Sequence, residues 1–169
     1  MNMNARYLPK NLSKKDKQKQ LHMLMTSRKL YKKGQYYNRN KKPLKSFTYK
    51  KSPHITKAMN MYKVDSIGAT NELSKATGCS KHALAKIINK GRGAYYSSGS
   101  RPNQSAQSWG VARLASSITS GKAASVDYAI LEKGCKSNSK ALTLAKKARA
   151  KHGHGTRRIP KVIITPLHI

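Results

Sequence analysis

The sequence predicts a mainly α-helical protein, with a small helical core that contains a helix-turn-helix-like pair, a long extended basic N-terminal arm and a short C-terminal strand. Three observations support this prediction. Apolar residues recur three or four positions apart between residues 52 and 151, with Ser, Thr or Gly at the ends of these stretches. Residues 1–51 hold 16 Lys or Arg and a single acid, and a β-branched run follows Pro160. We therefore expect a basic arm over 1–51, a helical domain over 52–151 and a tail over 152–169.

The charge of the chain indicates a polyanionic partner. The sequence has 36 Lys or Arg against 5 Asp or Glu, a net charge of +31 on 169 residues. Nucleic acid, an acidic protein surface or an anionic inner membrane face would each complement it. Leu, Ile, Val and Phe together make up 28 residues, below the roughly 20% under which a highly charged chain is usually disordered by itself. We expect a small core and order gained from partners.

The N-terminal segment predicts one helix followed by an aromatic and basic stretch. Ser13 and Asp16 resemble a capping box, and Leu21, Leu24 and Met25 form a thin apolar stripe, so a helix is expected over about 14–30. Tyrosines alternate with lysines and arginines in the following twenty residues. This stretch is either an extended arm whose rings stack on bases while its cations bind phosphates, or an amphipathic hairpin packed on its own domain.

Residues 52–91 predict three short helices. Ser52 and Pro53 begin the first, which ends near Val64. The string ELSKATGCSKHALAKIINKG then resembles a helix-turn-helix, with Leu73, Leu84 and Ile87 locking its two helices at a steep angle. Lys81, His82 and Lys86 would face the nucleic acid. The early part of the second helix lacks the Arg, Asn or Gln side chains that usually read bases, which weakens specificity more than affinity. A plain packing pair is the alternative.

Glycine and serine are frequent between residues 91 and 102, which predicts either a structured connecting loop or a phosphate cradle. Three helices are expected after it, over 104–120, 122–133 and 137–151. Asn103 or Ser105 would cap the first of them, and Gly121 would end it. Asp127 and Glu132 are expected to pair with Arg113 or Lys122 rather than to take part in catalysis.

The C-terminal residues 161–165 predict a short strand that could add to the edge of a neighbour's sheet. Cys79 and Cys135 have no CxxC spacing, so we expect two buried free thiols and no disulfide. No stretch approaches the roughly 20 apolar residues of a membrane span, and the N-terminus has no apolar block of the signal-peptide kind. These features predict a protein without a membrane span that is made in the cytosol.

Two strings carry a family resemblance: RYLPKNLSKKDKQKQ near the N-terminus and KGRGAYYSSGSRPNQSAQSWGVARLASSITSGKAASVDYAILEKGC in the second half. Through them the chain resembles an uncharacterised protein family encoded by large double-stranded DNA viruses, including algal viruses with icosahedral capsids. The resemblance covers most of the chain, and the string GRGAYYSSGSRPNQ is specific. It implies a virion-associated protein made in the host cytoplasm, and it supplies no catalytic residues.

Two functions are therefore open. The first is a minor capsid protein of a large double-stranded DNA virus, which bridges or cements other viral capsid proteins through basic extended segments. The alternative is a nucleic-acid-binding or DNA-condensing virion protein that uses the helix-turn-helix-like unit and the arm. We do not expect an enzyme, because the five acids are scattered and no third group orients Cys79 and His82. No cofactor or metal is expected.

Cations of the arm and of the helix pair are the residues expected to contact nucleic acid or an acidic partner. They are Lys14, Lys15, Lys32, Lys33, Arg39, Lys41, Lys42, Lys81, His82, Lys86 and Arg92. Four other residues are expected to serve packing: Tyr95, Tyr96, Trp109 and Gly121.

Overall fold

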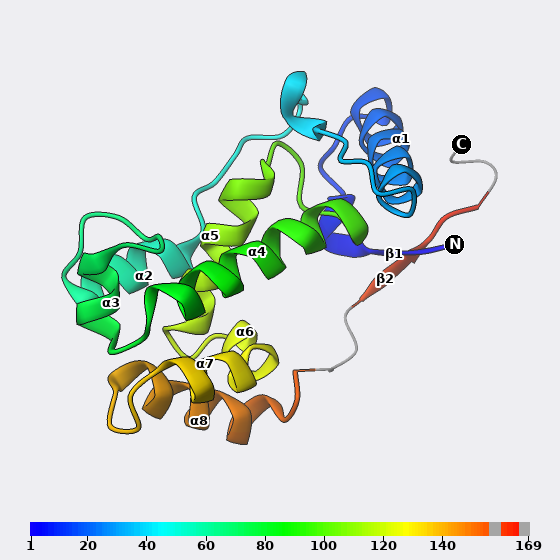
Figure 1. Cartoon of the computed structure of the whole chain (residues 1–169). Coiled ribbons are helices and arrows are strands. Elements are labelled where there is room, and N and C mark those ends of the chain that lie inside the picture. Colours follow the sequence, from blue (N-terminus) through cyan, green and yellow to red (C-terminus); the bar gives the residue numbers. More distant parts are fainter. Residues whose placement is uncertain (156–159, 166–169) are drawn as a thin grey trace. The chain divides into compact units, whose positions relative to one another are not determined.

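The computed structural model describes residues 1–155 and 160–165, and within them the protein is mainly helical with one two-stranded sheet (Figure 1). The expected mainly α fold class is confirmed. The elements are β1 (Asn2–Asn4), the 3-10 helix η1 (Ala5–Tyr7), α1 (Lys14–Tyr31), the 3-10 helix η2 (Arg39–Lys41), α2 (Pro53–Tyr62), α3 (Asn71–Thr77), α4 (Lys81–Ser97), α5 (Ala106–Ser117), α6 (Lys122–Val126), α7 (Tyr128–Gly134), α8 (Lys140–His152) and β2 (Lys161–Ile163). The expected tail includes residues 156–159 and 166–169, which lie outside the described ranges.

The chain divides into two units that are both discontinuous in sequence. Unit 1 consists of Met1–Lys50, Arg92–Ala106 and Arg158–Ile169, and unit 2 of Lys51–Gly91 and Gln107–Arg157. This division differs from the three consecutive segments expected above, because residues 92–106 and strand β2 pack with the N-terminal segment. Helix α4 contributes residues to both units.

The expected extended N-terminal arm is wrong, because this segment has its own strand, helix and core. β1 pairs antiparallel with β2 in a register that sets Met3 opposite Val162, and Figure 1 shows the two strands side by side. The expected C-terminal strand thus exists, but it adds to the chain's own N-terminus instead of a neighbour's sheet. Met3, Leu8, Leu21, Leu24 and Ile164 form a buried cluster in unit 1. The apolar stripe of α1 is therefore covered within the chain itself.

Helix α1 begins where its capping residues predict. The Ser13 Oγ accepts a hydrogen bond from the Asp16 backbone N–H at 3.2 Å. The Asp16 carboxylate does not return to the Ser13 amide as a capping box would require. It accepts bonds from the Ser46 N–H and Oγ at 2.8 and 2.7 Å, while the Ser13 N–H donates to the Ser46 Oγ. These bonds from Ser46 hold the pKa of Asp16 below its usual range and tie the segment after η2 to the start of α1.

Asn103, one of the two residues expected to cap the helix after it, instead ties another part of unit 1 together. Its backbone is left-handed, with φ of 58°. Its side-chain amide donates to the carbonyls of Leu44 and Phe47 at 3.1 and 2.9 Å, and its Oδ1 accepts from the Leu44 N–H at 2.7 Å. Leu44 packs with Leu12 and Met23 in a second small cluster. The aromatic and basic stretch after α1 is thus anchored to its own unit.

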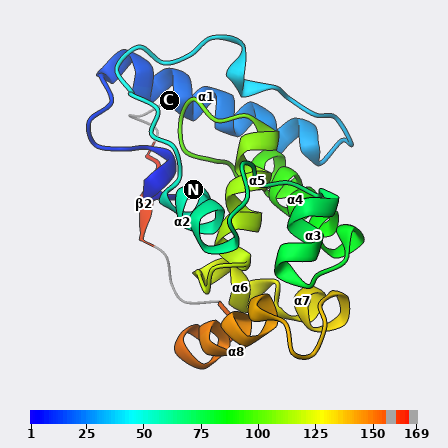
Figure 2. The ribbon, with the colours of Figure 1, turned by 90° about the vertical axis from the view of Figure 1, so that its left-hand side faces the viewer.

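The main core lies in unit 2. Leu73, Leu84, Leu114 and Leu131 are fully buried members of one cluster that extends from α2 to α8. Figure 2 shows α6, α7 and α8 gathered at one end of this unit. Helices α6 and α8 approach closely because the residues between them are small; alanines 124, 145 and 148 are fully buried there, and the Ser125 Oγ donates to a carbonyl of α8 at 2.8 Å.

Helix α4 is longer than predicted. It continues through Gly91 and Gly93 to Ser97, so the expected glycine-rich loop is wrong over its first half, and a phosphate cradle built on the amides of these two glycines is wrong with it. Gly91 lies against α5, where an added Cβ would come within 2.6 Å of the Gly110 Cα. The absent side chain therefore allows two helices to touch. A loop begins only near Gly99, whose φ is +119°.

The helix expected over 122–133 is divided at Asp127 into α6 and α7. Gly121, expected to end the preceding helix, has an extended backbone and stands at the N-cap of α6, while Ser120 takes the left-handed conformation. A side chain at Gly121 would collide with the Ser116 Oγ. This glycine is thus required for space and not for a positive φ.

Candidate nucleic-acid interface

The turn between α3 and α4 is bounded by capping residues of the kind that the sequence indicates. The Thr70 Oγ1 accepts from the Leu73 N–H at 3.1 Å to begin α3, and the Ser80 Oγ accepts from the Ala83 N–H at 3.1 Å to begin α4. Gly78 ends α3 with φ of +74°, and a Cβ there would lie 2.8 Å from the Ser139 Cβ. Both its backbone conformation and its surroundings therefore require glycine.

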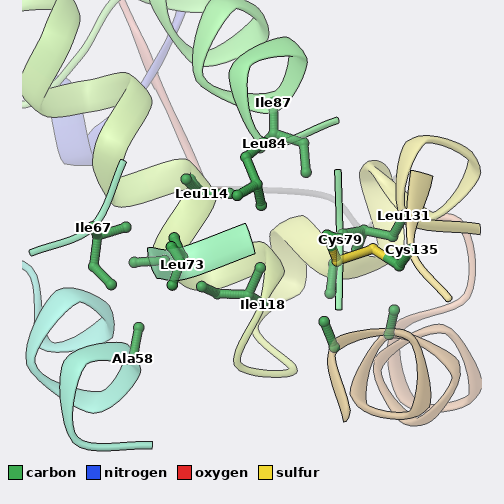
Figure 3. Close-up of a cluster of buried hydrophobic side chains, with 14 of the residues drawn as sticks. Ala58, Ile67, Leu73, Cys79, Leu84, Ile87, Leu114, Ile118, Leu131 and Cys135 are labelled. Carbon is green, nitrogen blue, oxygen red and sulfur yellow. A yellow bond between two sulfur atoms is a disulfide. The ribbon is translucent and has the colours of Figure 1, made fainter. Parts of the chain in front are cut away.

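Apolar contacts fix α4 in unit 2. Leu73, Leu84 and Ile87 are each 0% exposed, and Figure 3 shows them meeting Leu114 and Ile118 of the same cluster. All three residues belong to one buried cluster, and the steep angle expected between the two helices stays a prediction. Since they occupy one side of α4, its other side is left to solvent.

The solvent face of α4 carries a row of polar residues. His82, Lys86 and Asn89 are all exposed and lie four and three positions apart, which places them on one stripe of the helix. Lys81 is also exposed and flanks this stripe. Asn89 was missed above because only the early part of this helix was considered. Its spacing from His82 and Lys86 is the signal that could have identified it.

A shallow depression adjoins this stripe. Its volume is about 340 Å³, and the residues that line it come from the start of α4 and from α7. They are Ser80, His82, Ala83, Lys86, Ala129, Ile130, Lys133 and Gly134. Lys133, which the sequence did not single out, thus brings a further exposed cation beside Lys86. Gly134 is needed at this place because a side chain there would collide with the Ala83 methyl group.

A disulfide anchors the turn, so the expectation of two free thiols is wrong. Cys79 and Cys135 are bonded at an S–S distance of 2.02 Å. Two backbone bonds flank it: the Ser80 N–H donates to the Gly134 carbonyl at 2.7 Å, and the Lys136 N–H donates to the Gly78 carbonyl at 2.9 Å. The two cysteines are 56 residues apart in sequence. Only the fold brings them together, so no local spacing could have shown the pair.

Asp127 is a structural acid. Its carboxylate accepts from the Arg113 Nε and Nη2 at 2.9 and 2.7 Å and from the Ser117 Oγ at 2.9 Å, and the Lys90 Nζ lies 3.2 Å away. Pairing with Arg113 confirms the prediction for this acid. Since its side chain is fully buried and bonded to three groups, Asp127 holds α4, α5 and α7 together.

Most of the other expected contact residues belong to unit 1. Arg92 is exposed there, and so are the lysines of the N-terminal segment: Lys14, Lys15, Lys32, Lys33, Lys41 and Lys42. Their side chains are accessible to solvent, and contact with an anionic partner stays a prediction. Lys81, His82 and Lys86 belong to unit 2.

Arg39 is the exception, because its guanidinium is buried. The residue is only 6% exposed; its Nη1 donates to the Ser27 Oγ at 2.7 Å and its Nη2 to the Ser100 Oγ at 2.9 Å. The guanidinium also lies 3.7 Å from the centre of the Tyr95 ring. Arg39 is therefore a structural residue of unit 1, and the prediction that it contacts a partner is wrong.

Two of the residues predicted to serve packing lie around Arg39. Tyr95 is 1% exposed, and Tyr96 is half-buried against it with ring centres 5.0 Å apart. They pack from the last turn of α4 rather than across a loop. Trp109 is half-buried on α5.

No group of three or more His, Cys, Asp or Glu side chains is placed to hold a metal among residues 1–155 and 160–165. In these ranges no helix combines the length and the apolar character that crossing a membrane requires.

Together, the fold and the α4 surface define a small, strongly basic helical protein with an exposed cationic helix. The chain belongs to DUF5824, a family of unknown function whose family model matches residues 6–138. Nothing matches the chain among curated proteins or among solved structures.

Proposed function

We propose that this protein binds double-stranded nucleic acid through the α3–α4 pair, with α4 lying in the major groove. The observation that carries the proposal is the division of α4 into two faces. Leu84 and Ile87 fix one face in the core, and His82, Lys86 and Asn89 are left exposed in a row on the other. Such a fixed helix with a polar stripe is what groove binding requires.

Charge supports the same function. Each lysine that contacts a phosphate releases condensed counterions, so binding gains free energy in proportion to the number of contacts. Lys81 and Lys86 supply such contacts from α4 and Lys133 from α7. A net charge of +31 adds long-range attraction to any polyanion.

Asn89 adds a means of reading sequence. An asparagine amide can bond bidentately to the N6 and N7 atoms of adenine in the major groove, and such a pair is worth about 1–3 kcal/mol of discrimination. Lysine and histidine at the other positions of the stripe mainly provide affinity. The proposal is therefore a binder with a strong phosphate contribution and a preference at one or two base pairs.

The test is a salt titration of duplex binding by the full chain. Fluorescence anisotropy with a labelled duplex of about 20 base pairs gives the dissociation constant as a function of salt. Changing both Lys81→Gln and Lys86→Gln should weaken binding roughly tenfold or more and lower the salt slope by about two. The matched control is Lys146→Gln with Lys147→Gln, which removes the same charge from exposed positions on α8.

Equal weakening by the two double variants would show that charge acts diffusely, and the assignment of α4 would fail. A full chain that does not bind duplex at about 0.15 M salt would remove the function altogether. A shift in the preferred base pair on Asn89→Ala, with phosphate-dependent binding retained, would support base reading.

A structural role in a virion is the second proposal, and it rests on the resemblance of residues 6–20 and 90–135 to proteins of large double-stranded DNA viruses. The partners would be capsid proteins, or the anionic inner face of a membrane. The extended arm that was to bridge capsid subunits is absent, so this role would have to use the folded surfaces of the two units. Mass spectrometry of purified particles tests it, since absence of the chain from them would exclude the role.

A further inference from the structure

Unit 1 contains a row of four tyrosine rings that leads from its interior to its surface. The rings of Tyr95 and Tyr96 are 5.0 Å apart, those of Tyr96 and Tyr36 are 4.9 Å apart, and those of Tyr36 and Tyr31 are 6.2 Å apart. Tyr95 is buried and Tyr96 half-buried, whereas Tyr31 and Tyr36 are 37% and 71% exposed. The outer two rings thus offer aromatic surface to solvent.

The inner end of this row is held in place. The Arg39 N–H donates to the Tyr95 Oη at 3.3 Å, and the Arg39 guanidinium covers the ring. The Ser27 Oγ, itself bonded to that guanidinium, donates to the Tyr96 carbonyl at 3.0 Å. The buried arginine described above therefore anchors the tyrosines, and the exposed rings rest on an ordered support.

The surroundings of the exposed rings are cationic. Lys29, Lys32 and Lys33 are exposed around the end of α1, next to Tyr31 in the chain. The Tyr31 Oη lies at Gly93, 3.9 Å from where a Cβ would stand, and the neighbouring Arg92 is exposed. The only acid in the three segments of unit 1 is Asp16, whose carboxylate is bonded to Ser46. These cations have no acid of their own unit to pair with at this surface.

Exposed aromatic faces among exposed cations match one class of partner. Single-stranded nucleic acid offers phosphates at each nucleotide and flat apolar base faces free of a complementary strand. A duplex keeps those faces stacked inside, and an acidic peptide has the charge without the flat faces. We propose that Tyr31 and Tyr36 stack against unpaired bases of single-stranded DNA or RNA while Lys32, Lys33 and Arg92 contact its phosphates. This site is separate from the duplex site proposed on α4 and does not depend on it.

The test separates stacking from charge. Binding of the full chain to oligothymidylate of about 12 nucleotides is compared with binding to an abasic strand of the same length, which keeps the phosphates and lacks the bases. Tyr36→Ala should weaken binding to oligothymidylate about tenfold, within the range of about 5- to 150-fold that one lost stacking contact gives, and leave binding to the abasic strand unaffected. Tyr36→Phe keeps the ring and should restore binding.

Two controls make the result specific. Tyr49→Ala removes another exposed tyrosine that follows a lysine-rich stretch but lies outside the row, and it should change neither affinity. Lys32→Gln with Lys33→Gln should weaken the binding of both strands by the same factor and reduce the salt dependence of each. Because Tyr36 is exposed, melting temperatures should confirm that the Tyr36 variants are folded.

Three outcomes would overturn the proposal. The first is an abasic strand that binds as tightly as oligothymidylate, and the second is an equal effect of Tyr36→Ala on both. The third concerns an acidic peptide with the same net charge as oligothymidylate. If this peptide displaces oligothymidylate from the protein and also binds more weakly to Tyr36→Ala, the surface fits an acidic protein segment. Duplex affinity is measured on the same variants to separate this proposal from the one made for α4. Tyr36→Ala should leave duplex binding unchanged, so either site can fail without the other.

Discussion

Arg39 shows how a single residue can hold an otherwise polar segment. Its guanidinium is buried without an acid beside it, so two serine hydroxyls and the Tyr95 ring replace its water. Burial lowers the pKa of Arg39, although an arginine remains protonated in a protein. Charge-assisted hydrogen bonds and a desolvated cation–π contact each contribute about 1.5–3 kcal/mol. Arg39 therefore contributes more to the free energy of unfolding than its exposed neighbours do.

Arg39→Ala should therefore lower the free energy of unfolding by about 3 kcal/mol, because the serines and the ring lose their partner. Lys41→Ala, an exposed position in the same η2 turn, should change it by less than about 0.5 kcal/mol. Urea unfolding of both variants measures the difference. Equal stability of the two would contradict the structural role assigned to Arg39.

Tyr62 predicts how stability falls at alkaline pH. Its Oη donates to the Ile118 carbonyl at 2.6 Å, and burial raises the pKa of this phenol well above its ordinary value. The unfolded chain loses this proton near pH 10, whereas the folded chain retains it. The stabilisation is therefore complete below about pH 10 and is lost as the pH rises from there toward the folded pKa.

Tyr62→Phe should cost about 1 kcal/mol at neutral pH, because the Ile118 carbonyl loses its donor, and it should flatten the fall in melting temperature between about pH 9.5 and 11. Tyr49→Phe, at an exposed position, should leave that slope as it is in the parent chain. If the alkaline slope is unchanged in Tyr62→Phe, other groups control it.

At the scale of elements, two glycines of α4 make a matched pair. Alanine stabilises a helix relative to glycine by about 1 kcal/mol, so propensity favours substitution at both. At Gly91 the added Cβ would come within 2.6 Å of the Gly110 Cα, whereas at Gly93 its nearest neighbour is the Tyr31 Oη at 3.9 Å. The α5 backbone at Gly110 cannot move aside for a methyl group at Gly91, whereas a methyl group fits at Gly93.

Gly91→Ala should lower the free energy of unfolding by about 1–3 kcal/mol, because α4 and α5 must separate. Gly93→Ala should raise it by about 0.5–1 kcal/mol. Thermal melting of the two single variants should therefore show a lower melting temperature for Gly91→Ala and a higher one for Gly93→Ala. A stabilised Gly91→Ala would mean that the two helices are not in contact there.

The disulfide fixes the turn that places α4. By chain entropy, a bond closing a stretch of 56 residues contributes about 4 kcal/mol. A dithiol reductant should therefore lower the urea midpoint of the protein, and it should also weaken duplex binding if the turn orients α4. The variant with both Cys79→Ala and Cys135→Ala should not respond to reductant. An identical midpoint with and without reductant would contradict a formed disulfide.

At the scale of the whole molecule, the excess of 31 positive charges acts against folding, because the folded chain brings like charges closer together. Raising sodium chloride from about 0.05 to 0.5 M shortens the range of this repulsion and should raise the melting temperature by several degrees. Potassium chloride should give the same curve if screening is responsible. A melting temperature that stays flat or falls would show that repulsion among these charges does not limit stability.

Local signals allowed most helices to be predicted. Ser13, Ser52, Thr70 and Ser139 each accept a hydrogen bond from the first turn of the helix they precede, as their positions in the sequence indicate. Capping depends on residues two or three positions away, so it can be read without the fold. For the same reason, helical spacing was enough to predict that Lys81, His82 and Lys86 are exposed on α4.

What the sequence did not reveal depends on distant partners. Gly91 was expected to end a helix, because its real role, the close approach of Gly110, is a tertiary contact that the sequence does not show. Arg39 looked like an exposed cation because Ser27, Tyr95 and Ser100 lie far from it in sequence. The folded N-terminal segment was missed because its apolar stripe is completed by Ile164, from the other end of the chain.

The pairing of β1 with β2 has a consequence for synthesis on the ribosome. β1 leaves the exit tunnel long before Lys161–Ile163 are made, so a nascent chain holds Met3 and Leu8 without the Ile164 and Val162 that later cover them. This small patch stays uncovered until residues 162–164 have themselves left the tunnel. A stalled or prematurely ended chain would keep these apolar side chains exposed to solvent.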